Sequence, residues 1–321
     1  MTELDGVTRL HPALRAVATA RTDFSLSAIR AMREPFNQRR RDAAERVDPQ
    51  GVDVADRAVE RAAGPALPVR IYRGATANAA APVVVFCHAG GFTLGNLDTD
   101  HRQCLELARR ARCVVVSVDY RLAPEHPYPA ALDDAVAVVN WVADNAAQLG
   151  VDAARLAVAG SSAGGALAAC LAQLAADGAL PPVAFQLLHQ PVLDERDTGS
   201  KSEFRTSPGF DGEGAELMWG YYLDGAGDDS GHGAPPAAAI PARRPELSFL
   251  PAALITCAEI DPFRDEAVDY ARRLRAAGVS AELHVFPGAC HGFDSLLPDW
   301  SGSQRLFALQ GEALSRALRT G

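Results

Sequence analysis

A serine flanked by small residues at positions 160–165, in the order Gly-Ser-Ser-Ala-Gly-Gly, most restricts how this chain can fold. The apolar run 156–159 precedes it and predicts a buried strand that must turn sharply into a helix. In so tight a turn the central residue adopts strained backbone angles, and a larger neighbour would clash with the strand or the helix. The G-x-S-x-G pattern therefore predicts a strand, a turn and a helix that expose the hydroxyl of Ser162.

Two loops downstream supply the side chains that distinguish a nucleophilic serine from an ordinary strand-to-helix turn. Such a serine needs a base that accepts its proton and a carboxylate that orients the base. Asp261 follows the apolar run 252–257, and His291 follows the apolar run 281–286, so both are expected on loops after strands. Alone, Asp261 also fits an N-cap of the helix expected after it. The order serine, acid, histidine predicts a catalytic triad of Ser162, Asp261 and His291.

A pair of glycines follows another apolar strand. The run 83–87 leads directly into the sequence His-Ala-Gly-Gly, and backbone N–H groups converge on a negative charge only where no side chain intervenes. We expect an oxyanion hole made of the backbone N–H groups of Gly90, Gly91 and Ala163. His88, which begins the loop, is expected to support it. A glycine turn without a chemical role is the competing interpretation.

Five motifs in this order resemble those of the bacterial hormone-sensitive lipase family of α/β-hydrolase esterases, also called family IV. The motifs occupy residues 88–91, 119–133, 160–164, 261–266 and 291–293. The resemblance extends from about residue 65 to the end of the chain. It implies an α/β-hydrolase fold with a mostly parallel eight-stranded sheet flanked by helices and a helical cap.

The resemblance also implies hydrolysis of carboxylic esters without a cofactor or metal. An acyl-enzyme is expected on Ser162, with His291 acting as base and then as acid while Asp261 holds its imidazole. The chain departs from the family at two places, because Ala89 replaces the first glycine of the loop and Ser161 replaces the usual aspartate. We expect both changes to tune the substrate range rather than to change the reaction.

Apolar runs alternate with helical patterns along the chain, which indicates a mostly parallel sheet covered on both faces. The first strand is expected at 69–72, at an edge of the sheet. The predicted organisation is an N-terminal part of the cap at 1–50, a first part of the core at 51–194, a second cap segment at 195–245, and a second part of the core at 246–321.

The cap is expected to shape the substrate pocket. The residues predicted to line this pocket are Phe92, Met218, Trp219, Tyr221 and Tyr222. An aromatic helix face of this kind also fits a packed core, which is the competing interpretation.

Charge limits the partners of the protein. The chain has 321 residues and a net charge of -9, and it lacks a basic stretch that would neutralise nucleic-acid phosphates. The basic run 39–41 is followed by Asp42 and Glu45, which indicates a solvated helix face. No apolar run reaches the roughly 18–20 residues that span a bilayer, and no segment resembles a signal peptide. We therefore expect no stable membrane insertion and a cytoplasmic location.

The six cysteines occur singly, without a C-x-x-C pair, which favours free thiols over disulfides or a metal site. The predicted function is a serine carboxylesterase that hydrolyses small esters with short to medium acyl groups, as a monomer or homodimer. A non-hydrolytic small-molecule receptor on the same fold is one alternative. An amidase, deacetylase or acyltransferase that uses the same triad is another.

Overall fold

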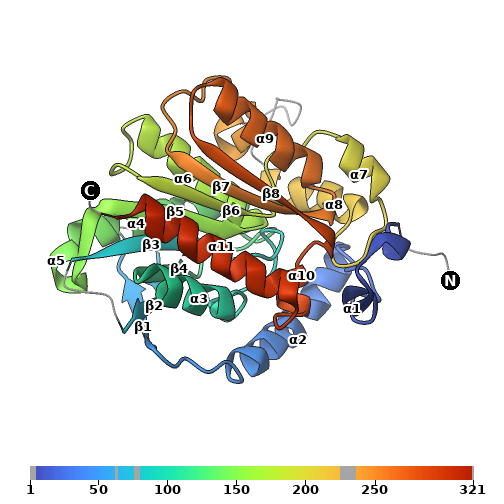
Figure 1. Cartoon of the computed structure of the whole chain (residues 1–321), viewed down its shortest axis with the longest axis horizontal. Helices are drawn as coiled ribbons and strands as arrows, with labels where there is room; N and C mark the ends of the chain where they lie inside the picture. Colours follow the sequence, from blue (N-terminus) through green and yellow to red (C-terminus); the bar gives the residue numbers. More distant parts are fainter. Residues whose placement is uncertain (1–4, 62–63, 76–79, 225–235, 320–321) are drawn as a thin grey trace.

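The computed structural model describes residues 5–61, 64–75, 80–224 and 236–319. Its strands are β1 (Val52–Val59), β2 (Leu67–Gly74), β3 (Ala81–Cys87), β4 (Val114–Val118), β5 (Val151–Ser161), β6 (Phe185–His189), β7 (Ala252–Ile260) and β8 (Ala281–Cys290). They form one eight-stranded sheet in the order β1-β2-β4-β3-β5-β6-β7-β8 (Figure 1). Strand β2 pairs antiparallel with β1 and with β4, and the other neighbours are parallel. The predicted α/β class with a mostly parallel sheet is confirmed.

The α-helices of the described residues connect and cover these strands. They are α1 (Pro12–Arg15), α2 (Leu26–Ala44), α3 (His101–Ala111), α4 (Ala130–Asp144), α5 (Ala146–Leu149), α6 (Ala163–Ala176), α7 (Gly199–Glu203), α8 (Gly212–Leu223), α9 (Arg264–Ala276), α10 (Phe293–Leu296) and α11 (Ser301–Ala317). None of the helices in this part of the chain is long and apolar enough to cross a membrane.

Alternating side chains of the central strands pack against helices on both faces of the sheet. Val84 and Phe86 of β3 belong to the apolar cluster that also contains residues of α3 and α11. Val83 and Val85 of the same strand belong to the cluster that contains residues of α4, α6 and α9. Figure 1 shows α3 and α11 together on the near side of the sheet. Because successive side chains of a strand point to opposite faces, a continuous apolar run fills both layers.

The strand expected at the sheet edge, 69–72, is wrong in its position, because it belongs to β2, which lies between β1 and β4. The edge strand beside it is β1, which the sequence pattern does not predict. Its terminal residues, Val52 and Val59, are buried. The residues between them, 53–58, are exposed or half-buried, and all of them except Val54 are charged or small. Among the described strands, β1 has β2 as its one neighbour and forms an edge of the sheet. An edge strand with little burial carries neither the apolar run nor the strict alternation from which strands are predicted.

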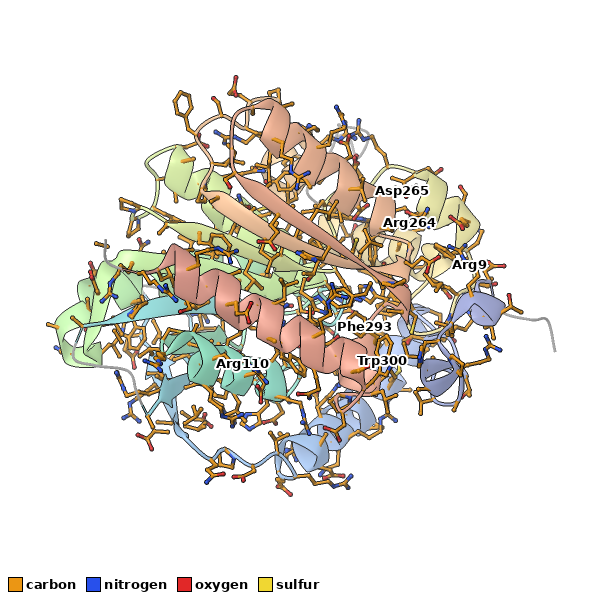
Figure 2. All side chains as sticks on the ribbon, viewed as in Figure 1. Arg9, Arg110, Arg264, Asp265, Phe293 and Trp300 are labelled. Carbon is orange, nitrogen blue, oxygen red and sulfur yellow. The ribbon has the colours of Figure 1, made fainter. Side chains whose placement is uncertain are left out.

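Arginine–glutamate pairs attach the N-terminal segment to α7 and α9. Arg9 contacts Glu203 at 2.5 Å, and Arg264 contacts the same carboxylate at 2.8 Å. The guanidinium carbons of Arg9 and Arg264 lie 5.4 and 5.3 Å from the ring centroid of Phe204. Figure 2 shows both arginines on one side of the molecule. Exposed pairs of this kind contribute roughly 0–1 kcal/mol each, so they mainly fix where the segment lies.

Ion pairs also join the two predicted cap segments to each other. Arg21 contacts the buried carboxylate of Asp211 at 2.7 Å and the carboxylate of Glu213 at 2.5 Å. Residues 1–4 of the first segment and 225–235 of the second lie outside the described residues. The division of the chain into core and cap stays a prediction, for which these contacts offer a physical basis.

We expect Leu167→Ala to lower the free energy of unfolding by about 2–5 kcal/mol, because it empties space in the packed layer between α6 and the sheet. Leu167 is fully buried, whereas Leu217 on α8 is 41% exposed and provides a matched control. Leu217→Ala should change stability by less than about 0.5 kcal/mol. Urea unfolding followed by circular dichroism measures both, and equal losses would contradict the assigned packing.

Candidate active site

Ser162 lies in a sharp turn between β5, which ends at Ser161, and α6, which begins at Ala163. Its backbone has a φ of 56° and a ψ of -118°, a conformation that non-glycine residues rarely adopt. A Cβ atom at Gly160 would overlap the carbonyl oxygen of Gly164, and one at Gly164 would overlap the carbonyl oxygen of Cys87. The turn therefore needs glycine on both sides of the serine.

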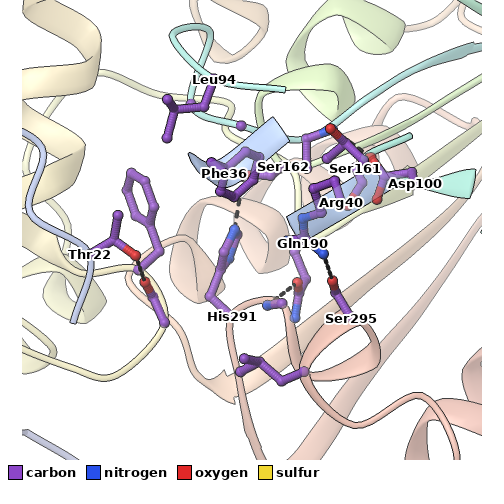
Figure 3. Close-up of a pocket in the computed structure, with 18 of the residues that line it drawn as sticks. Thr22, Phe36, Arg40, Leu94, Asp100, Ser161, Ser162, Gln190, His291 and Ser295 are labelled. Carbon is purple, nitrogen blue, oxygen red and sulfur yellow. Dashed lines mark hydrogen bonds between the residues drawn. The ribbon is translucent and has the colours of Figure 1, made fainter. Parts of the chain in front are cut away.

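The structure brings the three predicted triad residues together. Nε2 of His291 lies 2.9 Å from Oγ of Ser162, and Nδ1 of His291 lies 2.9 Å from Oδ2 of Asp261. Figure 3 shows the imidazole of His291 directed toward Ser162. Asp261 is fully buried, while Ser162 and His291 are 3% and 8% exposed. These distances fit a nucleophile, a base and a group that orients the base.

The register of the sheet explains why Asp261 and His291, which are distant in sequence, lie side by side. Ile260 of β7 is paired with Cys290 of β8, so Asp261 and His291 are the next residues after a matched pair of strand ends. Asp261 also accepts a hydrogen bond from the backbone N–H of Phe263 at 2.8 Å. This bond fixes the second carboxylate oxygen toward the imidazole.

Neighbouring side chains restrict the position of His291. The rings of Phe210 and Phe263 lie 5.5 and 5.3 Å from the imidazole, measured between centroids. The carboxamide of Gln190 accepts a hydrogen bond from the N–H of Gly292 at 2.8 Å. No sequence pattern predicts the positions of Gln190, Phe210 and Phe263 beside His291, because these contacts depend on loops that are distant in sequence.

The predicted oxyanion loop follows β3 and ends beside the elbow. Gly90 has a φ of +135°, and a Cβ atom there would overlap the carbonyl oxygen of Leu94. The backbone N–H groups of Gly90, Gly91 and Ala163 donate to no acceptor among the described residues. They are thus available to a substrate oxygen, as an oxyanion hole requires.

Two buried side chains hold this loop. The ring of His88 stacks on Tyr120 with centroids 4.1 Å apart, and the Tyr120 hydroxyl donates to the carbonyl oxygen of His88 at 2.7 Å. Burial lowers the pKa of His88 to about 4, so its ring is neutral at neutral pH. The N–H of Ala89 donates to Oδ2 of Asp100 at 2.6 Å. These contacts agree with the expectation that His88 supports the oxyanion loop.

A cavity of about 420 Å³ opens above Ser162 and His291. Its apolar wall is formed by Phe24, Met32, Phe36, Leu94, Phe210 and Leu296. Most of this wall comes from α2, the residues just before it, and the loop that precedes α8. Among the described residues, no group of three or more His, Cys, Asp or Glu side chains is arranged to hold a metal ion.

The predicted pocket residues Phe92, Met218, Trp219, Tyr221 and Tyr222 do not line this cavity, which corrects the sequence-based assignment. Phe92 stacks on Tyr222 with centroids 3.8 Å apart, and Trp219 lies 5.8 Å from the same phenylalanine. Met218 is fully buried. Phe92, Met218, Trp219 and Tyr222 are buried core residues, whereas Tyr221 is half-buried and its hydroxyl donates to the carbonyl oxygen of Phe24. Residues of α2 contribute to the cavity wall instead.

The interpretation of the basic run 39–41 as a solvated helix face is wrong for Arg40. Arg40 is half-buried and lines the cavity, and Arg39 borders it as well, whereas Arg41 is exposed. Met32, Phe36 and Arg40 recur every four residues and therefore lie on one face of α2. This four-residue spacing is the sequence signal from which the cavity-facing side of α2 could have been predicted.

We expect Gly164→Ala to lower the free energy of unfolding by about 1–3 kcal/mol, because the added methyl group overlaps the backbone of β3. Gly220→Ala is the matched control, since a Cβ atom at Gly220 in α8 meets nothing within 4 Å. Alanine is the better helix former, so the control should be unchanged or more stable. Thermal unfolding measures both, and an unaffected Gly164→Ala protein would contradict the described elbow.

The stability of the protein should depend on the protonation of Asp100. Burial raises its pKa to about 6, and the charge of Asp294 adds to this, whereas the Ala89 N–H and Arg40 oppose it. The folded protein thus holds this proton more tightly than the unfolded chain does. The group contributes stability below about pH 4 and loses that contribution as the pH rises through about 6.

Asp100→Asn removes this titration but keeps an oxygen that accepts from Ala89. The stability of the variant relative to the native protein should therefore increase between pH 4 and pH 7. Urea unfolding at several pH values measures this difference, in which the other titrating groups cancel. A difference that is constant with pH would contradict the burial of a charged Asp100.

Known proteins have the same fold and similar sequences. A family model described as the alpha/beta hydrolase fold matches residues 84–295. The crystal structure of the esterase LipW from Mycobacterium marinum has a TM-score of 0.95 and 65% identity, and the match covers 99% of both chains. The Mycobacterium tuberculosis esterase LipI is 43% identical over 263 residues, which is 81% of each chain. The carboxylesterase NlhH of the same species is 45% identical over 228 residues, which is 71% of each chain. The chain therefore belongs to the α/β-hydrolase fold family, among the esterases that resemble bacterial hormone-sensitive lipases.

Proposed function

We propose that this protein is a serine carboxylesterase that hydrolyses small esters with short to medium acyl groups through an acyl-enzyme on Ser162. The observation that carries the proposal is the unbroken chain of two 2.9 Å contacts from Ser162 through His291 to Asp261. This chain ends at a cavity rather than in the core. The relatives named above as esterases support the same activity.

In the first half of the reaction, Oγ of Ser162 attacks the ester carbonyl carbon while Nε2 of His291 takes the hydroxyl proton. The carbonyl oxygen becomes an oxyanion that accepts hydrogen bonds from the N–H groups of Gly90, Gly91 and Ala163. One such donor is typically worth about 2.7–4 kcal/mol in the transition state. The buried carboxylate of Asp261 stabilises the imidazolium, which then protonates the departing alcohol.

In the second half, His291 deprotonates a water molecule that attacks the acyl carbon. The oxyanion forms again in the same hole, and its collapse breaks the bond to Ser162. The proton held by His291 returns to the serine oxygen, and the carboxylic acid leaves. No metal or cofactor enters this scheme.

The size of the cavity supports small substrates. A volume of about 420 Å³ holds a short acyl chain together with a small alcohol, and the apolar wall suits an alkyl group. The complete triad supports hydrolysis over a receptor that only binds. The proposal also includes a cytoplasmic location, which six unpaired and buried cysteines support. It further includes a monomeric or homodimeric state and no nucleic-acid partner, in line with the net charge of -9.

We expect measurable turnover of p-nitrophenyl acetate and butyrate, with a smaller kcat/KM for long acyl chains because the cavity is short. Ser162→Ala should reduce kcat by at least about 10³-fold, since the nucleophile is lost while the hole remains. Ser248→Ala, at an exposed serine away from the cavity, is the matched control and should keep full activity.

Turnover that survives Ser162→Ala would remove the proposed mechanism. A p-nitroanilide with the same acyl group tests the amidase alternative, because only the leaving group differs. Faster cleavage of the anilide than of the ester would favour an amidase.

A further inference from the structure

The cavity above Ser162 is also lined by a group of polar side chains. We call this group the polar arm and define it by Arg40, Asp100, Ser161 and Ser295, all of which line the cavity. Figure 3 shows these four residues on one side of the catalytic pair, with Leu94 on the other. They come from α2, the residue before α3, the end of β5, and α10.

The guanidinium of Arg40 has donors to spare. Its flat face lies over Phe36, with the central carbon 4.9 Å from the ring centroid, so its N–H groups point outward from the edges. Among the described residues, the only hydrogen bond of this guanidinium goes to Oγ of Ser295, while the charges of Asp100 and Asp294 attract it without a direct ion pair. Burial lowers the pKa of Arg40, which reflects the loss of water around the charge. A half-buried arginine with unused donors favours an acceptor on the ligand.

The same arm also offers acceptors. Oδ2 of Asp100 accepts from the N–H of Ala89 at 2.6 Å, and no described residue donates to its other oxygen. Ser161 stands before the nucleophile, is buried and lines the cavity, and its Oγ forms no hydrogen bond with the described residues. Asp294 lies in the same cavity wall and contacts His189 at 3.1 Å. The two carboxylates would repel an anionic substrate group, so they disfavour a carboxylate as the partner of Arg40.

A neutral hydroxyl group fits this combination, because it accepts a hydrogen bond from Arg40 and donates one to Asp100. We propose that the polar arm binds a hydroxyl group of the substrate, so that the preferred esters carry a hydroxyl on their alcohol or acyl part. This inference rests on the proposed esterase function and narrows its substrate class. Arg40 is then a residue that determines specificity, without a part in the bond-breaking steps.

Two matched pairs of esters test the inference and distinguish the two positions of the hydroxyl. Glyceryl 1-monoacetate against propyl acetate places it on the alcohol, and p-nitrophenyl 3-hydroxybutyrate against p-nitrophenyl butyrate places it on the acyl group. We expect kcat/KM to favour the hydroxylated member of at least one pair by about tenfold, mainly through KM, because a hydrogen bond to a charged donor is worth that much.

Arg40→Met should abolish this preference, so that the kcat/KM of the hydroxylated ester falls about tenfold more than that of the unhydroxylated ester. Arg41→Met is the matched control, because Arg41 lies on the same helix but is exposed and does not line the cavity. It should keep the preference. Arg40→Gln retains a shorter donor and should keep part of it, which also provides a test if Arg40→Met does not fold.

Equal loss on both members of a pair would overturn the inference, since Arg40 would then be structural. Absence of any preference in the native protein would overturn it too, as would faster turnover of p-nitrophenyl hemisuccinate than of either hydroxylated ester. In each case, hydrolysis of unhydroxylated esters that depends on Ser162 would leave the proposed function intact. Loss of that hydrolysis as well would remove both.

Discussion

The backbone of Ser162 is the constraint on which the site depends. A φ of 56° at a serine costs of the order of 1–3 kcal/mol, so the surrounding structure must impose it. Strand β5 on one side and α6 on the other impose this conformation. They can approach each other this closely because Gly160 and Gly164 have no Cβ atom that would overlap the neighbouring backbone. The strained conformation places the hydroxyl of Ser162 at the edge of the sheet instead of in the packed layer between the sheet and the helices.

The parallel part of the sheet then delivers the remaining groups to that edge. β5 through β8 run in the same direction, so the loops that follow them emerge together. Asp261 and His291 follow paired residues of β7 and β8, and the oxyanion loop follows β3, which neighbours β5. Chemistry that requires contacts of about 3 Å thus results from strand register, a property set by the whole core.

The residues proposed to carry out the reaction and the residues that shape the substrate cavity come from different parts of the chain. The groups proposed to break the bond lie on loops of the rigid sheet, whereas the cavity wall is built largely by α2 and the residues before it. Ion pairs such as that of Arg21 with the buried carboxylate of Asp211 hold the N-terminal segment in this position. Substitutions in α2 can therefore change which ester fits while Ser162 and His291 keep their geometry, which is the separation on which the inference about Arg40 depends.

The sequence by itself determined the alternation of strands and helices, the elbow at Ser162, and the order of acid and base after it. These depend on local patterns, because apolar runs and glycine at tight turns have the same physical effect wherever they occur. Strand β1 was not predicted, because an edge strand carries little apolar pattern. Only the tertiary structure decided that α8 packs as core and that Arg40 faces the cavity. Which face of a helix meets a site depends on how distant segments dock, and sequence spacing alone does not specify that contact.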